Sequence, residues 1–558
     1  MQNRFKPVLL ALMTSVSTAG SVMAYADTII DNARGYTLNQ NQQLIQFQAL
    51  AFDDAGKVIA IGQGKDLAAR LPSARHIDAA GKTLLPGLID AHGHVFALGS
   101  SQTQLGLRVT SNLEQAQQAI ADYARRFPQH QWIIGGEWNQ ANWKLGRFPT
   151  AQEIDIVVKD RPVWLARVDG HAGWANTRAL QLAGINKNTP DPAGGKIEKD
   201  AQGQPTGILI DSAMRLVDQV LPAASEAEQR VALDAALLQL AQVGLTSVHD
   251  AGVSEPADKL FREYAAQGKL NTRVYGMIRG TDTFFDKVSA SGPLTSYADD
   301  HYALRAVKLF ADGALGSRGA ALMAPYSDAP HTQGLLFKSQ DEMSAMIKKA
   351  ASKGYQVNVH AIGDAGNHQI LEGFAALPAS MSADLRHRIE HAQVVALTDI
   401  PRFKQLGILP SMQPTHATSD MNMAEDRVGA ERIKGAYAWR SFLQQGSRIA
   451  CGSDFPIESP NPFWGIHAAV TRQDMSGKPA QGWHADQAMT LLEAFRCFTI
   501  DAAYAAHQEN ILGSLEKGKW ADFILIDQDM FQIPVQNIYQ IKVLQTWVGG
   551  KQVYQATK

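Results

Sequence analysis

Six residues that can bind metal ions or move protons occur along the chain, each at the end of a hydrophobic run. They are His92 and His94 in LPGLIDAHGHV, Lys308 in LRAVKLFADGALGSR, His360 in YQVNVHAIGD, His391 in RHRIEHAQ and Asp454 in RIACGSDFPI. Imidazole and carboxylate groups are the usual ligands of zinc. Strands that each end in such a residue are typical of a (β/α)₈ barrel, whose active site is built at the carboxyl ends of several strands.

His92 and His94 give the strongest local signal. Alternate residues of a strand point to the same face, so both imidazoles can bind one ion. A lone His-x-His pair is weak evidence, because histidines also occur in cores and on surfaces; here Asp90 precedes the pair and four more ligand-type residues follow. Asp454 is predicted to be catalytic as well as a ligand, because a carboxylate beside a metal-activated hydroxide can accept a proton and pass it to the leaving group. The alternative for Asp454 is a turn residue in Gly-Ser-Asp-Phe-Pro.

The spacing of the hydrophobic runs predicts the barrel that would position these residues. Strand-like runs end near Asp250, Met277, Phe310, His360, His391, Met412 and Gly452. Most steps are about 30 residues, which is one βα unit, and LPGLIDAH as the first strand brings the count to eight. Lys308 then falls on strand four, His360 on strand five, His391 on strand six and Asp454 after strand eight. The stretch from about 100 to 243 is too long for one connection and predicts an inserted subdomain.

At these residues the chain resembles the amidohydrolase superfamily, and most closely its long exported branch, amidohydrolase family 3. The likeness is carried by the ligand-type residues in their order, together with DGHAGWANTRAL, SVHDAG and VKLFADGALGSRGAAL. It covers nearly everything after the N-terminal segment. The resemblance implies a TIM-type barrel of the α/β class, with a small β-sandwich beside it that both chain ends build together.

Lys308 is the least conventional member of the set. A protonated ammonium is a poor metal ligand, but a buried lysine loses its charge more easily. The resemblance implies that the amine of Lys308 is carboxylated and bridges two divalent metals, with zinc the expected ion. The alternative is a lysine paired with Asp312, with one metal held by His92, His94, His360 or His391, and Asp454. The alternative for His360 and His391 is a hydrogen-bonded core histidine.

Five further residues are candidates for substrate binding. They are His171 in VDGHAGWANTRAL, His249 in SVHDAG, Arg318 in GALGSRGA, and Gln413 and His416 in SMQPTHATSD. The two histidines before the fourth strand could equally be core residues, and Arg318 could equally form a structural ion pair instead of binding a carboxylate. Tryptophans at 132, 138, 143, 164 and 174 predict either an apolar core for the insertion or an aromatic wall that would favour apolar or aromatic acyl groups.

The first 26 residues have the order of a secretory signal peptide. Arg4 and Lys6 precede a short apolar stretch, and Ala24-Tyr25-Ala26 fits an A-x-A cleavage site. The stretch is too short for a stable membrane anchor, so we expect a periplasmic or secreted protein. Cys451 and Cys497 are the only cysteines; we interpret them as buried small apolar residues more readily than as a disulfide.

Length and composition indicate a globular enzyme with more than one domain. At 558 residues the chain exceeds what one core usually supports. We expect a signal peptide at 1–26, a β-sandwich from 27–85 and 513–558, a barrel from 86–99 and 244–512, and an inserted subdomain at 100–243. The net charge is −2 and no basic stripe occurs, which argues against nucleic acid as a partner. Self-association into a homo-oligomer stays open.

Together these features predict a metal-dependent hydrolase that cleaves an amide-type C–N bond in a small molecule with a metal-activated hydroxide. Deamination and the hydrolysis of lactones or esters are alternatives on the same site, because the fold does not select among them. A catalytically silent periplasmic binding protein is the alternative from another class. A complete ligand set argues against that alternative.

Overall fold

A computed structural model describes residues 27–557 apart from 129, 141, 169, 171, 193, 194 and 383. The predicted signal peptide and His171 therefore lie outside the described residues. Within the described part of the chain, no helix is both long and apolar enough to cross a membrane.

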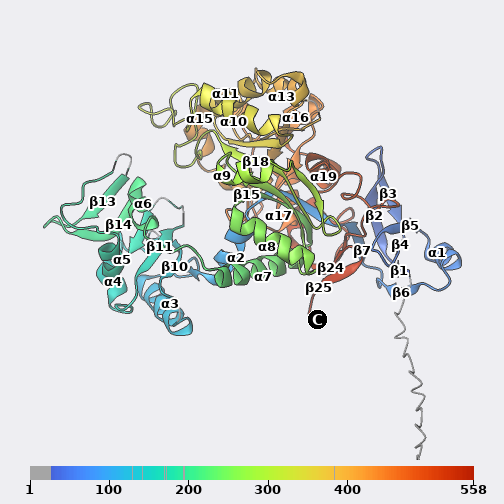
Figure 1. The fold of residues 1–558 in the computed structure, drawn as a ribbon, viewed down its shortest axis with the longest axis horizontal. Coiled ribbons are helices and arrows are strands. Elements are labelled where there is room, and N and C mark those ends of the chain that lie inside the picture. The colour runs from blue at the N-terminus through green and yellow to red at the C-terminus, as the bar shows by residue number, and fades with distance from the viewer. Residues whose placement is uncertain are drawn as a thin grey trace, which may run out of the picture.

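The centre of the molecule is a nearly closed barrel of eight parallel strands with helices around it (Figure 1). In order around the barrel these are β8 (Leu88–Gly93), β15 (Leu245–Val253), β16 (Arg273–Arg279), β18 (Tyr302–Phe310), β19 (Gln356–Ala361), β20 (Arg388–His391), β21 (Leu409–Met412) and β22 (Ala450–Cys451). A parallel bridge from Gly93 to Phe455 brings the segment after β22 back to β8. The predicted fold class is confirmed, and Lys308, His360 and His391 lie on the fourth, fifth and sixth barrel strands.

Helices connect the barrel strands, as parallel pairing requires. They include α8 (Glu255–Ala266), α9 (Thr283–Ser289), α10 (Gln340–Ser352), α11 (Asp364–Ala375), α12 (Ala379–Ser382), α13 (Ile400–Leu406), α14 (Pro414–Asp420), α15 (Ala424–Arg432) and α16 (Trp439–Gln444). After β22 follow α17 (Pro462–Thr471), α18 (Leu491–Cys497) and α19 (Ile500–Ala505). A short strand, β17 (Leu294–Tyr297), pairs antiparallel with the first residues of β18. The helix starts were readable locally: Ser339 and Glu342 form a capping box at α10.

Between β8 and β15 the chain builds a separate sheet of six strands. Its strands are β9 (Leu105–Gly106), β10 (Ile133–Trp138), β11 (Val163–Arg167), β12 (Ala172–Ala175), β13 (Gly195–Lys199) and β14 (Pro205–Asp211), with helices α3 (Leu113–Arg126), α4 (Ala151–Asp155), α5 (Thr177–Leu182) and α6 (Arg215–Asp218). In Figure 1 this part lies to the left of the barrel. It is joined through α2 (Val95–Thr103) and α7 (Glu226–Gln242), which pack together. Its limits at 100 and 243 remain a proposal.

The tryptophans of this insertion form its interior. Trp138, Trp143 and Trp174 lie in one buried cluster, and their rings meet at centroid distances of 6.0–6.3 Å. Trp164 belongs to a second buried cluster, and Trp132 packs against it. The aromatic wall over the barrel mouth was therefore the wrong one of the two interpretations, because a subdomain this small must use its large apolar side chains to fill its own core.

Both ends of the chain contribute to one sheet beside the barrel. In it β25 (Lys551–Gln555), β24 (Val543–Val548) and β23 (Phe523–Ile526) continue into β7 (Thr83–Pro86), β2 (Arg34–Leu38) and β3 (Leu44–Phe47). A four-stranded sheet of β1 (Thr28–Asp31), β4 (Ala49–Phe52), β5 (Val58–Gly62) and β6 (Arg75–Asp78), with helix α1 (Gly64–Arg70), packs nearby. Apolar residues of both chain ends share one core between the sheets. This is the composite sandwich that the resemblance implied.

The two cysteines form a disulfide, which corrects the prediction that they are unpaired. Cys451 lies on β22 and Cys497 ends α18, with Cα atoms 5.1 Å apart. Both are buried, as predicted. Strand-like and helix-like patterns in the sequence give no information about which helix packs on which strand, so the pairing could not be deduced before the fold was known.

Candidate metal centre

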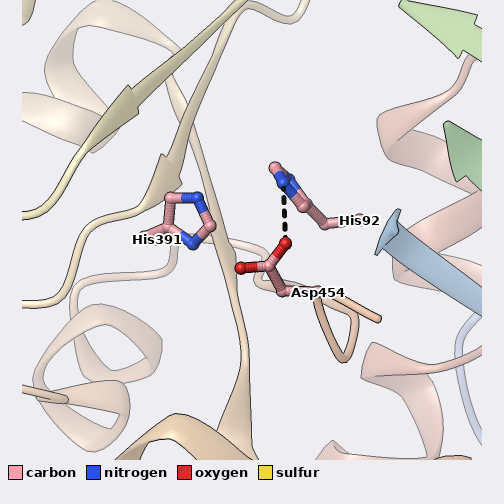
Figure 2. A group of neighbouring side chains, drawn as sticks. All are labelled: His92, His391 and Asp454. Carbon is pink, nitrogen blue, oxygen red and sulfur yellow. Dashed lines mark ion pairs between the residues drawn. The ribbon is translucent and has the colours of Figure 1, made fainter. Parts of the chain in front are cut away.

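The ligand-type residues converge at the carboxyl ends of the barrel strands. His92 is on β8, His391 ends β20, and Asp454 follows β22. Figure 2 shows their side chains turned toward one another, and one ligand atom from each lies within 4.8 Å of the other two. Residues separated by several hundred positions thus share one small polar space.

The other three predicted ligands border the same space. His94 Nε2 donates a hydrogen bond to Asp454 Oδ1 at 3.1 Å. Lys308 Nζ lies 3.1 Å from His92 Nε2. The His360 ring is 4.6 Å from that of His391, centroid to centroid. All six side chains therefore form one continuous cluster.

Hydrogen bonds fix which nitrogen of two imidazoles faces the cluster. His92 Nδ1 lies 2.6 Å from Glu390 Oε2, and His391 Nδ1 lies 2.8 Å from Gln413 Oε1. A carboxylate or amide oxygen can only accept, so both Nδ1 atoms carry the proton. The lone pair of each ring is therefore on Nε2, and in His92 it faces Lys308 Nζ. A hydrogen-bond partner on Nδ1 is usual for a histidine that binds metal through Nε2.

Burial sets the charge of the cluster. It lowers the pKa of His92 and His391 well below the ordinary value, and lowers that of His360 to about 4. Burial likewise lowers the pKa of the Lys308 amine. Burial alone would raise the pKa of Asp454, but the hydrogen bond from His94 and the nearby imidazoles hold it well below its usual range. At neutral pH His92, His360 and His391 are thus neutral and Asp454 is ionised, which are the protonation states that a divalent cation needs in its ligands.

Two buried carboxylates anchor the loops that carry these residues. Asp90 accepts hydrogen bonds from the amides of His92 and Ser453 and from the Ser453 hydroxyl, and so ties β8 to the segment that holds Asp454. Burial raises the pKa of Asp90 to about 7. The left-handed backbone of Asp454, with φ of 61°, is thereby held in place.

Asp312 supports the loop after β18 and does not pair with Lys308. Its carboxylate accepts from the backbone amides of Ala321, Ile362 and Gly363 at 2.8–3.0 Å. Burial raises its pKa to about 7. The Lys308 amine instead contacts His92, so the alternative of a Lys308–Asp312 ion pair is not the arrangement in this structure.

Comparison with known proteins identifies the family. Residues 75–554 match the amidohydrolase family. The protein YtcJ of Bacillus subtilis (strain 168) is 34% identical over 87% of this chain and 91% of its own length. The chain belongs to the amidohydrolase family. This confirms the predicted family and the prediction of a metal-dependent amidohydrolase.

Two other amidohydrolase-like relatives extend the comparison. The N-substituted formamide deformylase of Arthrobacter pascens is 29% identical over 95% of this chain and 99% of its own length. The crystal structure of an uncharacterized metal-dependent hydrolase from Pyrococcus horikoshii OT3 has a TM-score of 0.78 at 28% identity, covering 91% of this chain and 99% of that one.

The candidate substrate residues of this amidohydrolase lie in different surroundings. Gln413 holds His391, and His416 Nε2 lies 3.7 Å from Asp454 Oδ2. His249 is buried, with its Nδ1 3.0 Å from Arg388. Arg318 bonds to Asp328 at the surface with both Nε and Nη2, the ion pair that was its alternative. A role for any of them in substrate binding stays a prediction.

Sequence reasoning missed Glu390 and Phe310. Glu390 is fully buried and orients His92, while Phe310 lies two residues after Lys308 with its ring 5.5 Å from that of His360. A signal for Glu390 was present: Arg388 and Glu390 alternate in a buried strand, and two charged residues on one face of such a strand indicate a polar barrel interior. Phe310 looked like one more apolar strand residue.

Proposed function

We propose that this amidohydrolase cleaves amide-type C–N bonds of small molecules with two divalent metal ions held by His92, His94, Lys308, His360, His391 and Asp454. The observation that carries the proposal is the convergence of these six side chains at the carboxyl ends of the barrel strands, where barrel enzymes place their chemistry. One relative is named an N-substituted formamide deformylase, and this name supports an amide-type C–N bond as the bond that is cleaved.

The residues fit divalent metals by their donor chemistry. One ring nitrogen of His92, one of His391 and a carboxylate oxygen of Asp454 are mutually within 4.8 Å. Zinc is the proposed ion, because nitrogen and oxygen donors on a compact site suit it. When bound, the metal supplies a Lewis acid that lowers the pKa of a water and polarises the scissile carbonyl.

Lys308 is proposed to be carboxylated. Its buried amine has a lowered pKa and lies 3.1 Å from His92 Nε2. A neutral amine can add to carbon dioxide, forming an N–C bond and releasing one proton. The resulting carbamate would carry a negative charge between the imidazoles, where a bridge between two cations is needed to reduce their repulsion.

The chain's own groups account for the proton transfers. Asp454 is ionised and is placed by His94 and Asp90, so it can accept the proton of the nucleophilic water and later donate it to the departing nitrogen. Glu390 and Gln413 keep His92 and His391 in the Nδ1–H tautomer throughout. An amine leaving group needs such a proton, which makes Asp454 the proposed catalytic residue.

We also propose that the enzyme is exported to the periplasm or secreted after cleavage near Ala26. The tripartite pattern of the first 26 residues supports export. The buried disulfide between Cys451 and Cys497 supports it independently, because such bonds persist in oxidising compartments.

The test combines metal analysis with a substrate panel. Purified enzyme should contain close to two metal ions per chain, lose activity on chelation and regain it with Zn²⁺. N-substituted formamides, N-acyl amino acids, aminopurines and lactones should be assayed side by side. Amine release from the amides supports the proposal. Ammonia release from aminopurines or ring opening of lactones, with the amides untouched, would replace it by one of the other chemistries, and an active chelated enzyme would end the metal model.

A further inference from the structure

The mouth of the barrel carries an unusual number of exposed apolar side chains. Of the thirteen large hydrophobic residues exposed in the described part of the chain, one ends β18 and five lie in the segments that follow β18 and β22. They are Phe310, Met323, Leu335, Leu336, Phe337 and Ile457. Exposed apolar residues scattered singly are ordinary, but a group of them beside a reactive centre marks a binding surface.

Phe310 connects this surface to the candidate metal ligands. Its ring lies 4.8 Å from Lys308 Nζ and 5.5 Å from the His360 ring, yet the residue is 37% exposed. It is therefore in contact with two members of the cluster on one side and open on the other.

The neighbouring apolar residues are held beside Phe310 by the backbone. The amide of Phe337 donates to the carbonyl of Ala311, the residue after Phe310, at 2.8 Å. Ile457 approaches from another strand end: its amide donates to the carbonyl of Asp454 at 2.9 Å. The apolar residues thus stand on two sides of the cluster, after the fourth and the eighth strand.

Two arginines of this region are already paired with a carboxylate of the protein. Arg318, which the sequence suggested for a substrate carboxylate, is bonded to Asp328 through two of its nitrogens at 3.2 and 2.9 Å. Arg427 also contacts that carboxylate. These guanidinium groups are already neutralised by a carboxylate of the protein.

We propose that Phe310, Leu336, Phe337 and Ile457 form an apolar subsite that binds an alkyl or aryl substituent of the substrate next to the bond that is cleaved. This inference rests on the proposed function and names its substrate class: amides that carry an apolar alkyl or aryl substituent. Phe310 is the specificity-determining residue, because it alone in this set touches the ligand cluster through its ring.

The affinity of hydroxamic acids tests the subsite without turnover, because the hydroxamate binds metal and its tail reports on the surroundings. Acetohydroxamate, hexanohydroxamate and benzohydroxamate are titrated calorimetrically into zinc-loaded full-length enzyme. Each buried methylene should raise the affinity roughly fourfold, so hexanohydroxamate should bind at least about tenfold more tightly than acetohydroxamate. Equal affinities of the three acids would overturn the proposal.

Variants assign the effect to the named residues. Phe310→Ala and, separately, Ile457→Ser should each reduce the ratio of hexanohydroxamate to acetohydroxamate affinity severalfold. Leu238→Ala is the matched control, because Leu238 is a similarly exposed apolar residue on the outer helix α7. An unchanged ratio in both mouth variants, or an equal loss in the Leu238 variant, would refute the assignment.

A second measurement separates this inference from the proposed function. Saturation-transfer NMR with N-methyl-2-phenylacetamide, whose benzyl group is on the acyl side like the hydroxamate tails, requires neither metal nor hydrolysis. The phenyl protons should receive saturation in the wild-type enzyme and lose most of it in Phe310→Ala. If no amide is hydrolysed while this signal and the hydroxamate ratios persist, the proposed reaction fails and the apolar subsite stands. If amides are hydrolysed equally well with methyl and benzyl substituents, and the phenyl signal is absent, the subsite fails and the reaction stands.

Discussion

Removal of the disulfide between Cys451 and Cys497 should destabilise the barrel without directly disturbing the ligand cluster. The bond closes a loop with a sequence separation of 46 residues between strand eight and helix α18. Closing a loop of that length lowers the conformational entropy of the unfolded chain, which should stabilise the folded protein by about 4 kcal/mol at 25 °C. Both cysteines are buried, so replacement by alanine adds a small further loss of packing.

Unfolding should be followed in oxidised wild-type enzyme, in wild-type enzyme reduced while unfolded and then refolded with reductant, and in Cys451→Ala/Cys497→Ala. For a barrel of this size, a loss of about 4 kcal/mol lowers the melting temperature by about 7 °C. The double variant is its own control, because reductant should shift the wild-type transition and leave that of the variant unchanged. Activity at 25 °C should stay within a few-fold, since helix α18 carries none of the proposed ligands.

A difference below about 1 kcal/mol between oxidised and reduced wild type would refute the reasoning. It would mean either that the unfolded chain already holds these segments together or that the pair does not form in the native protein. Mass spectrometry of unreduced peptides distinguishes the two. A loss of activity in a fully folded double variant would instead show that the bond positions Asp454, which lies three residues after Cys451.

Three further predictions concern the site and the pH dependence of folding. His94→Ala should lose metal and activity together, whereas Asp454→Asn should retain most of its metal and lose about 10²–10⁴-fold in turnover; elemental analysis with kinetics checks both, and full metal with normal activity in the His94 variant would contradict the site. Lys308→Ala should lose a metal ion and regain partial activity with millimolar formate or acetate, which His94→Ala should not; the absence of rescue at any acid concentration, with an unmodified lysine in the mass of the native enzyme, would count against the carbamate. Burial lowers the pKa of His387 to about 4, and its Nδ1 accepts a hydrogen bond from the Val357 amide at 3.0 Å. The unfolded chain, in which a histidine has a pKa of about 6.5, therefore takes up a proton more readily than the folded protein, and stability is lost as the pH falls below about 6.5. Between pH 7 and 4.5 this histidine should account for about 2.5 kcal/mol of lost stability. Denaturant unfolding at several pH values should show that the free energy of unfolding falls less steeply with decreasing pH in His387→Leu than in the wild type. An equally steep fall in the two proteins would exclude His387 as the cause.

The barrel and its ligand-type residues could be predicted because each is encoded locally. An apolar run, a ligand-type residue at its end and a spacing near 30 residues recur along the chain, and the hydrophobic pattern alone fixes the strands. Lys308, His360 and His391 could therefore be numbered by strand before any fold was known. The long gap after His94 likewise required an inserted structure.

What could not be predicted depends on contacts between distant segments. The pairing of Cys451 with Cys497 requires knowing that α18 packs on β22. The orientation of His92 by Glu390 spans 298 residues. The sequence shows the same five tryptophans whether they fill a core or line a surface. Only the packing of β10 and β12 shows that they fill the core of the insertion. Contacts of this kind form only in the folded protein and produce no periodic pattern in the sequence.

The sheet shared by both chain ends has a consequence for the order in which the protein can be completed. Strand β23 pairs with β7, and β7 leads directly into the first barrel strand. Arg273, buried at the start of β16, has its carboxylate partner in Asp522, at 2.7 and 3.1 Å. Until the last forty or so residues have been synthesised, β7 is an open edge and a barrel arginine has no counter-ion, both of which disfavour a compact intermediate. A truncation ahead of Asp522 should therefore yield protein that is captured by chaperones and proteases and does not fold into a smaller enzyme.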